Sequence, residues 1–248
     1  MSYSFFAEFY DKLTVNADYK KRADYLTELF KKHSHSPGLT LDLACGTGNM
    51  TIELRKRGWD IFGADASAEM LMIAQNKAFE SGLDILFVNQ KMQELELFGR
   101  IDSCICTLDS VNHITSKKEL QKAFEKVSSY LAPGGLFVFD ANTVYKHSTI
   151  LGDNCYIYDM DEVFCAWQNS FIKRNNKVII TLDFFEKRED NSYIRSSEQF
   201  SERAYTFEEI KEMIEMSEMK IEAVYDDLTF APPVQETQRE IYVIRKEK

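Results

Sequence analysis

Between residues 38 and 142, short apolar strands alternate with helical segments, and this alternation constrains the fold more than any other feature of the chain. The strands are apolar along most of their length, which indicates a parallel sheet that is buried on both faces. The helical segments are the crossovers, and serine caps and glycine stops mark several of their ends. An open sheet of this kind binds its ligand at the carboxyl ends of its strands. The five predicted strands are 40–44, 60–64, 85–89, 103–107 and 136–140.

Both ends of the chain add elements to this core. The N-terminal residues predict two helices, and a capping box that starts at Thr206 opens a helix near the C-terminus. Two strands then follow without a helix between them, which indicates an antiparallel hairpin. We therefore expect an α/β fold with a doubly wound, mostly parallel seven-strand sheet and an N-terminal helical cap. The segments concerned are helices 3–13, 18–32 and 206–216 and strands 220–225 and 240–245.

The segment between residues 143 and 205 breaks the alternation. Its apolar residues recur at every second position, for example at Val178 and Ile180, and asparagine-containing turns separate such runs. This pattern predicts an inserted antiparallel sheet. The predicted organisation is thus a core formed by residues 1–142 and 206–248, with an insertion over 143–205. The insertion serves either as a lid over the ligand site or as the surface of a homodimer.

Composition limits the class of protein and of partner. Hydrophobic residues make up 44% and charged residues 28% of the 248 residues, which is typical of a globular domain. The net charge of −10 repels phosphate backbones, so nucleic acid is an unexpected partner. The five cysteines are an odd number in mostly strand-like runs, so free buried thiols are expected. The longest uncharged stretch, 127–139, is too short to span a membrane, and without a visible secretion signal we expect a cytoplasmic protein.

The most informative motif lies at the turn after the first strand, where the sequence from Asp42 to Gly48 reads DLACGTG. Two glycines allow a tight turn and let a ligand come close to the backbone. The dinucleotide-binding pattern has a third glycine at the position of Thr51, so the pyrophosphate cradle is incomplete. Asp65 follows the second strand, where a carboxylate can accept hydrogen bonds from both ribose hydroxyls. A nucleoside ligand without a pyrophosphate group fits both observations.

Three segments resemble, in order and spacing, the motifs of the class I S-adenosylmethionine-dependent methyltransferases. They are the glycine turn, the segment 63–71 (GADASAEML) and the segment 131–140 (LAPGGLFVFD). The resemblance covers residues 38–142 and implies a Rossmann-like sheet with S-adenosylmethionine as the cofactor. The N-terminal aromatic residues and the inserted sheet are similar to a bacterial branch that methylates small molecules such as glycine and amino sugars on nitrogen.

The resemblance also implies where the cofactor lies. The glycine turn would hold its methionine part, the end of the second strand its ribose and adenine, and the end of the fourth strand its sulfonium, while N-terminal tyrosines help to close the site. After the third strand the family usually has an acidic residue that holds the adenine amino group. Lysine, which this chain has there, cannot accept a hydrogen bond from an amine, so Gln90 or a backbone carbonyl is the alternative. The implied cofactor residues are Tyr10, Tyr19, Asp42, Cys45, Gly46, Gly48, Asp65, Ala66, Gln90, Lys91, Met92 and Leu108.

Methyl transfer from a sulfonium needs few protein groups. The methyl donor is already activated, and transfer is an in-line displacement that depends mainly on the alignment of the two reactants. A base is needed only when the nucleophile arrives protonated. The nearest candidates are Asp109 and His113, after the fourth strand, with Tyr145 and His147, after the fifth, as alternatives.

We expect a methyltransferase that modifies a nitrogen or oxygen atom of a small molecule. The chain lacks, after its fourth strand, the Asn/Asp-Pro-Pro-aromatic motif of enzymes that methylate exocyclic amines of DNA. Two alternatives remain open. One is a module that binds S-adenosylmethionine or S-adenosylhomocysteine without catalysis, and the other is a nicotinamide-dependent oxidoreductase, which would share the glycine turn and Asp65. No metal ligand set is predicted.

Overall fold

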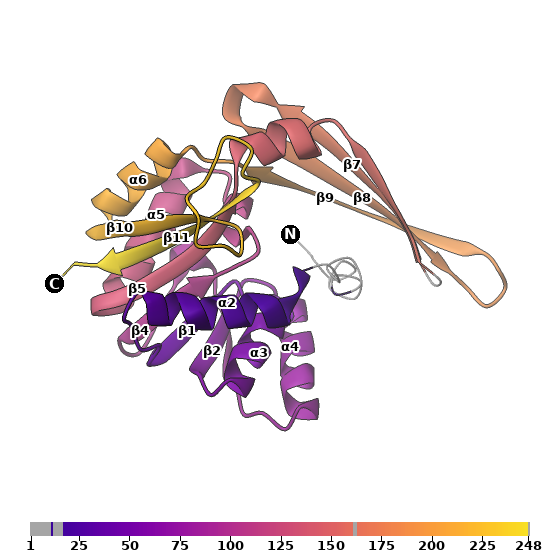
Figure 1. Cartoon of the computed structure of the whole chain (residues 1–248). Coiled ribbons are helices and arrows are strands. Elements are labelled where there is room, and N and C mark those ends of the chain that lie inside the picture. Colours follow the sequence, from indigo (N-terminus) through magenta and orange to yellow (C-terminus); the bar gives the residue numbers. More distant parts are fainter. Residues whose placement is uncertain (1–10, 12–16, 161–162, 248) are drawn as a thin grey trace.

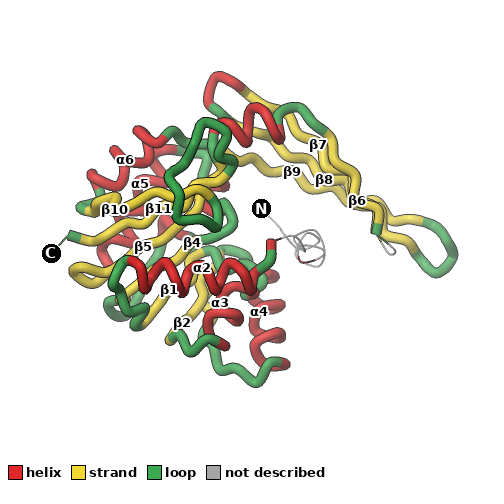
Figure 2. The backbone as a smooth tube through the Cα atoms, viewed as in Figure 1, coloured by secondary structure: helices red, strands yellow, loops and turns green. Residues whose placement is uncertain are grey.

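The computed structural model describes residues 11, 17–160 and 163–247, which form two β-sheets with helices around the larger one (Figure 1, Figure 2). The strands of the larger sheet are β1 (Leu39–Leu43), β2 (Asp60–Asp65), β3 (Phe87–Asn89), β4 (Ile101–Cys106), β5 (Leu131–Asn142), β10 (Met219–Asp226) and β11 (Arg239–Lys246). Their order in space is β10-β11-β5-β4-β1-β2-β3. β11 is antiparallel to β5 and β10, whereas the strands from β5 to β3 are parallel. The predicted mostly parallel sheet with a terminal hairpin is confirmed.

Helices cover both faces of this sheet. α2 (Tyr19–Lys32) and α3 (Asn49–Lys56) share one hydrophobic cluster with the sheet, and α5 (Lys117–Tyr130) and α6 (Phe207–Met216) share another. α4 (Ala68–Glu80) lies beside α3 and contacts β2 and β3. The doubly wound arrangement leaves the carboxyl ends of the parallel strands to the loops, which is where the site forms.

Side-chain caps set the starts of several helices, as the sequence predicted. Ser67 and Ser116 accept hydrogen bonds from the backbone N–H groups three residues further along, at 3.2 Å for α4 and 3.4 Å for α5. Thr206 and Glu209 form a reciprocal capping box at the start of α6. Each of these bonds satisfies a donor that the first turn of a helix leaves without a partner.

Strand β5 begins earlier than predicted, and this is a correction. The pattern placed the strand at 136–140, but pairing with β4 already starts at Leu131, opposite Ile101, and shifts register before it continues at Leu136. A side chain at Gly135 would lie 2.8 Å from two carbonyl oxygens, so the irregular stretch requires glycine there. Pairing with β4 therefore extends β5 toward its N-terminal end. A local sequence pattern does not show such pairing.

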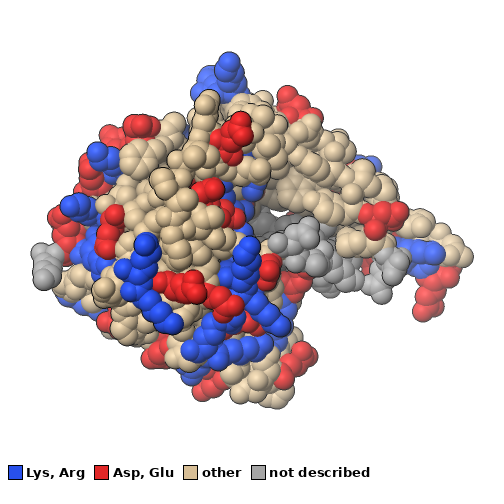
Figure 3. Space-filling model, viewed as in Figure 1, with Lys and Arg blue, Asp and Glu red and all other residues tan. Residues whose placement is uncertain are grey.

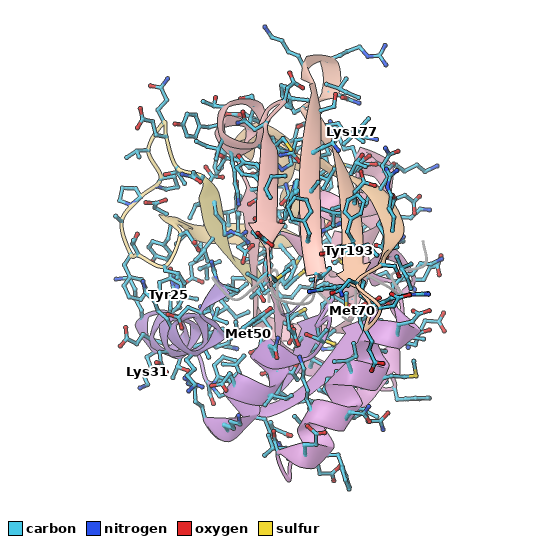
Figure 4. The ribbon with its side chains drawn as sticks, turned by 90° about the vertical axis from the view of Figure 1, so that its right-hand side faces the viewer. Tyr25, Lys31, Met50, Met70, Lys177 and Tyr193 are labelled. Atoms are coloured by element: carbon cyan, nitrogen blue, oxygen red, sulfur yellow. The ribbon has the colours of Figure 1, made fainter. Side chains whose placement is uncertain are left out.

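The inserted segment forms the second sheet. Its strands are antiparallel in chain order and are β6 (Cys155–Asp159), β7 (Val163–Ile172), β8 (Lys177–Lys187) and β9 (Tyr193–Arg203). Asn176 and Asn191 have positive φ in the predicted turns between these strands. Figure 1 shows the sheet as an arm that projects from the core. In Figure 4, which faces this arm, Lys177 and Tyr193 mark opposite ends of the β8–β9 pair.

The predicted helix 18–32 is confirmed as α2, and Asp18 caps it through the N–H of Lys21. The predicted helix 3–13 lies outside the described residues except for Asp11. Among the residues that the structure describes, no helix has the length and apolar character needed to cross a membrane.

Candidate active site

The glycine turn connects β1 to α3 at the carboxyl end of the sheet. Gly46 and Gly48 have φ of 53° and 76°, in the left-handed region that glycine adopts without strain. A Cβ at Gly46 would meet no atom of the described residues within 4 Å, so among these residues this side of the turn is open to a ligand. A Cβ at Gly48 would lie 2.8 Å from the Cβ of Ala74, so this glycine lets α4 pack closely. Gly46 therefore leaves space for a ligand, and Gly48 allows α4 to pack against the turn.

A buried carboxyl group, that of Asp42, links the strand before the glycine turn to the helix after it. Asp42 is 1% exposed, and its Oδ2 accepts a hydrogen bond of 2.5 Å from the Thr51 hydroxyl. Burial raises the pKa of Asp42 to about 7, and the bond from Thr51 offsets part of this effect. Thr51 stands where the dinucleotide pattern has glycine, and its hydroxyl is the hydrogen-bond donor that Asp42 needs.

Asp65, at the end of β2, is tied to the same turn. Its Oδ2 accepts from the N–H of Gly46 at 2.9 Å, and its Oδ1 accepts from the N–H of Ser67 at 2.8 Å. Burial raises the pKa of Asp65, while these backbone N–H groups act in the opposite direction. A carboxylate has about four acceptor sites, so Asp65 keeps sites for the hydroxyls of a ribose. Ala66, the next residue, is exposed.

A cavity at the carboxyl ends of β1 and β4 brings together predicted residues from three parts of the chain. Tyr19 from α2, Cys45 and Gly46 from the glycine turn, and Leu108 from the loop after β4 all line it. Tyr10, the other predicted tyrosine, lies outside the described residues.

The residues after β3 have these contacts within the protein. Both polar atoms of the Gln90 side chain bond to the backbone of Glu96, at 2.7 and 2.9 Å, and close the loop. Lys91 is exposed and pairs with Glu94 at 3.4 Å. Met92 packs against the core on the side of α5. Each of these two Gln90 atoms keeps a second hydrogen-bonding site, so Gln90 stays a predicted adenine contact.

The loop after β4 has a strained backbone at the predicted sulfonium position. Leu108 and Asp109 have φ of 58° and 54°, which is unfavourable for residues with a Cβ. The carboxylate of Asp140 at the end of β5 accepts hydrogen bonds from both N–H groups, at 2.8 and 2.6 Å. Asp140 thereby holds the two residues in this conformation.

Asp109 belongs to a buried ionic network and is not available as a base. Its two carboxylate oxygens accept from Arg239 and from Asn142, each at 2.8 Å. Burial disfavours its charged form, but the positive charges of Arg239 and Lys146 outweigh burial and hold the pKa of Asp109 well below its usual range. The prediction that Asp109 accepts a proton is therefore corrected, because a carboxylate with so low a pKa is a weak base.

His113 faces a carboxylate that the sequence analysis missed. Its Nε2 lies 3.8 Å from Oε1 of Glu202, and its ring stacks on Phe200 with centroids 5.3 Å apart. Glu202, at the end of β9, is 6% exposed, and its Oε2 lies 3.2 Å from Nε2 of the fully buried His147. The site thus contains His113 from the core and Glu202 from the inserted sheet. Tyr145 is half-buried and precedes His147 in the turn after β5.

The position of Glu202 on β9 carries only a weak sequence signal. On β9 it shares a face with Phe200, and it lies opposite the buried Val178 of β8. Ser196 and Glu198 lie on the same face of β9, so the sequence pattern alone does not single out Glu202. Its partners come from segments that are far away in the chain.

Comparison with known proteins adds evidence of a different kind. Residues 40–135 match the family model described as a methyltransferase domain. The putative methyltransferase YqeM of Bacillus subtilis is 30% identical over 249 residues, which cover 100% of this chain and 98% of that protein. The crystal structure of an S-adenosylmethionine-dependent methyltransferase from Clostridium acetobutylicum has a TM-score of 0.88 and 36% identity, with 99% of each chain covered. The chain belongs to the class I S-adenosylmethionine-dependent methyltransferases.

The methyltransferase family assignment decides between the alternatives that the sequence left open. The protein is an enzyme, its methyl donor is S-adenosylmethionine, and the nicotinamide-dependent alternative is wrong. The residues present fit this cofactor, because Gly46 leaves an open side on the turn and Asp65 offers acceptor sites beside it. A glycine/sarcosine N-methyltransferase of Halorhodospira halochloris is 33% identical over 140 residues, which cover 53% of this chain and 51% of that protein.

Proposed function

We propose that this methyltransferase acts on a nitrogen or oxygen atom of a small molecule, and that an amine nitrogen is the preferred acceptor. The observation that carries the proposal is the group formed by Asp109, His113 and Glu202. One ligand atom of each side chain lies within 4.8 Å of the other two. The group adjoins Leu108, where the family resemblance puts the sulfonium. Two carboxylates and an imidazole in this arrangement suit a cationic group that has to lose a proton.

The charges around this group bear on the charge state of the acceptor. Three carboxylates, those of Asp109, Asp140 and Glu202, are accompanied by two basic side chains, Arg239 and Lys146, which leaves one negative charge. The sulfonium of bound S-adenosylmethionine, which the family resemblance puts at Leu108, supplies one positive charge and balances this site. The charge count therefore favours an amine that has lost its proton before the methyl group is transferred.

His113 is the group best placed to remove the proton. Its side chain is 35% exposed, whereas that of Glu202 is 6% exposed and lies behind it. After His113 accepts the proton, the nearby carboxylate of Glu202 stabilises the imidazolium, as in other pairs of a base and an orienting acid. When bound, S-adenosylmethionine supplies an activated methyl group on its sulfonium. The neutral nitrogen is then aligned for in-line displacement, and alignment accounts for much of the rate.

The surface charge supports a small acceptor in preference to a nucleic acid. The net charge is −10, and Figure 3 shows acidic and basic side chains interspersed over the visible face. Nucleic-acid binding proteins instead concentrate basic residues on one face or stripe. The relatives named as N-methyltransferases support nitrogen as the acceptor atom.

The test compares matched amine and alcohol acceptors, with release of S-adenosylhomocysteine as the readout. We expect turnover of amines and, for His113→Gln, a loss of kcat of about 10²–10⁴-fold with unchanged affinity for S-adenosylhomocysteine. His35→Gln is the matched control, because His35 bonds to Asp102 and Ser103 away from the site. Turnover of alcohols alone would contradict the amine proposal, and an unaffected His113→Gln would contradict the role of His113.

A further inference from the structure

His147 lies behind the candidate base and has no part in the chemistry described so far. Its side chain is fully buried, whereas that of His113 is partly exposed. Full burial separates the His147 imidazole from any ligand that enters from solution. Within the described residues its side chain has one hydrogen bond, in which Nε2 lies 3.2 Å from Oε2 of Glu202. His147 therefore reaches the site only through Glu202.

The two carboxylate oxygens of Glu202 have different surroundings. Oε2 has contacts to His147 and to Nδ2 of Asn142, at 3.2 and 3.4 Å. The orientation of the Asn142 amide is set by its Oδ1, which accepts from Nζ of Lys146 at 2.8 Å. Oε1 faces Nε2 of His113 at 3.8 Å, which is longer than a hydrogen bond. One oxygen of Glu202 is therefore held, and the other is left for His113.

The second ring nitrogen of His147 indicates which form of the imidazole is present. Nδ1 is buried and has no hydrogen-bond partner among the described residues. A proton on Nδ1 would bury an N–H group without an acceptor, at a higher cost still if the ring were charged. A neutral ring with its proton on Nε2 leaves only a lone pair without a partner at Nδ1. This tautomer is also the neutral form that donates to the Glu202 carboxylate.

Backbone hydrogen bonds fix both partners of this contact. His147 lies in the turn η4 (Lys146–Leu151), where its N–H donates to the carbonyl of Thr143 at 3.1 Å. Its own carbonyl accepts from the N–H of Gly152 at 2.9 Å. Glu202 belongs to β9, which pairs along its length with β8. The contact is therefore formed before a ligand binds, as a group that orients a base requires.

We propose that His147 is a positioning residue, which as a neutral imidazole donates from Nε2 to Glu202 and keeps the other carboxylate oxygen directed at His113. The inference rests on the proposed role of His113 as the base. With Nε2 of His113 directed at Glu202, Nδ1 is the nitrogen that accepts the proton from the acceptor amine. The resulting imidazolium then donates from Nε2 to Oε1. Without its second donor, Glu202 is free to turn away from that imidazolium.

The first measurement tests the contact without any turnover. Long-range ¹H–¹⁵N NMR spectra of the full-length protein report which ring nitrogens of each histidine carry a proton. The chain has four histidines, and the spectrum of His147→Gln assigns the signals of His147 by their loss. At neutral pH we expect a protonated Nε2 and an unprotonated Nδ1. A proton on Nδ1, alone or together with one on Nε2, would overturn the proposal.

The second measurement is methyl transfer, with release of S-adenosylhomocysteine as the readout. His147→Leu removes the donor and should lower kcat about 10- to 100-fold, the effect of a misplaced catalytic group. The acceptor KM and the affinity for S-adenosylhomocysteine should stay unchanged, because His147 contacts neither ligand. His147→Gln keeps a side-chain N–H donor and should retain more of kcat than His147→Leu. The matched control is His33→Leu, which removes a similar contact, 2.7 Å to Glu222 at the end of α2, and should keep the wild-type kcat.

A double variant tests whether His147 acts through His113. His113→Gln/His147→Leu should have the kcat of His113→Gln alone, because the orienting contact has no effect once the base is absent. Additive losses, or equal losses in His147→Leu and His147→Gln, would overturn the proposal by indicating a structural role alone. Wild-type kcat in His147→Leu beside an impaired His113→Gln would overturn the positioning role and leave the proposed function intact. Wild-type kcat in His113→Gln would instead contradict the proposed base, so the two failures are distinguishable.

Discussion

At the scale of single residues, the protein shifts the pKa values of two aspartates in opposite directions. Asp42 is buried with the hydroxyl of Thr51 as its partner, and burial raises its pKa to about 7. Asp109 is half-buried, and the positive charges of Arg239 and Lys146 lower its pKa. The neighbouring groups therefore keep Asp109 charged near His113, while Asp42 binds a proton under the glycine turn until the pH approaches neutrality.

The pKa of Asp42 predicts how stability depends on pH. An unfolded aspartate releases its proton near pH 3.9, whereas folded Asp42 keeps it until about pH 7. The folded state therefore binds more protons in this range, and its free energy of unfolding falls as the pH rises. Relative to Asp42→Asn, the wild type should lose up to about 4 kcal/mol between pH 4 and 7.5, measured by urea denaturation. A pH-independent difference would show that folded Asp42 has an ordinary pKa.

At the scale of elements, one asparagine joins the inserted sheet to the core at the site. The turn η3 (Ser110–His113) follows β4, and its Asn112 is fully buried. The Asn112 side chain accepts from the N–H of Asn142, at the end of β5, and donates to that residue's carbonyl, at 2.8 and 3.1 Å. It also donates to the carbonyl of Arg203, at the end of β9, at 2.9 Å. His113 follows Asn112 and Glu202 precedes Arg203, so these bonds keep His113 and Glu202 close to each other.

This role of Asn112 predicts a large loss of stability. Asn112→Ala leaves three buried backbone groups without partners and should lower the free energy of unfolding by about 2–4 kcal/mol. The matched control is Asn154→Ala, which removes one exposed bond to the carbonyl of Ile150 and should cost less than about 1 kcal/mol. Urea denaturation measures both values. Equal costs for the two variants would contradict the connecting role.

The elements also show where sequence reasoning succeeds and where it stops. The caps at Ser67 and Thr206 were predictable because a cap depends on residues within one turn. The start of β5 was not, because it depends on pairing with β4. The glycine turn and Asp65 were recognisable from motif spacing, whereas Glu202 lies 89 positions after its partner His113 and reaches it only through the tertiary fold.

At the scale of the whole molecule, two parts of the fold contribute to one site. The parallel sheet supplies the glycine turn, Asp65 and His113 from the carboxyl ends of its strands. The inserted sheet supplies Glu202, and the segment that leads into it supplies His147. Glu202 faces His113, so the base of the inserted sheet contributes to the site, and both the lid and the dimer-surface alternatives for the insertion stay predictions.

The central claim is that the cofactor binds at the carboxyl ends of β1, β2 and β4 and that Asp65 holds its ribose. The most direct test is a calorimetric titration of the wild type and of Asp65→Ala with S-adenosylhomocysteine. Loss of charge-assisted hydrogen bonds should weaken binding by about 1.5–3 kcal/mol, or roughly 10- to 150-fold. Asp65→Asn, which keeps one acceptor oxygen, should fall between the two. Equal affinity of Asp65→Ala and the wild type would contradict the assignment of Asp65 to the ribose.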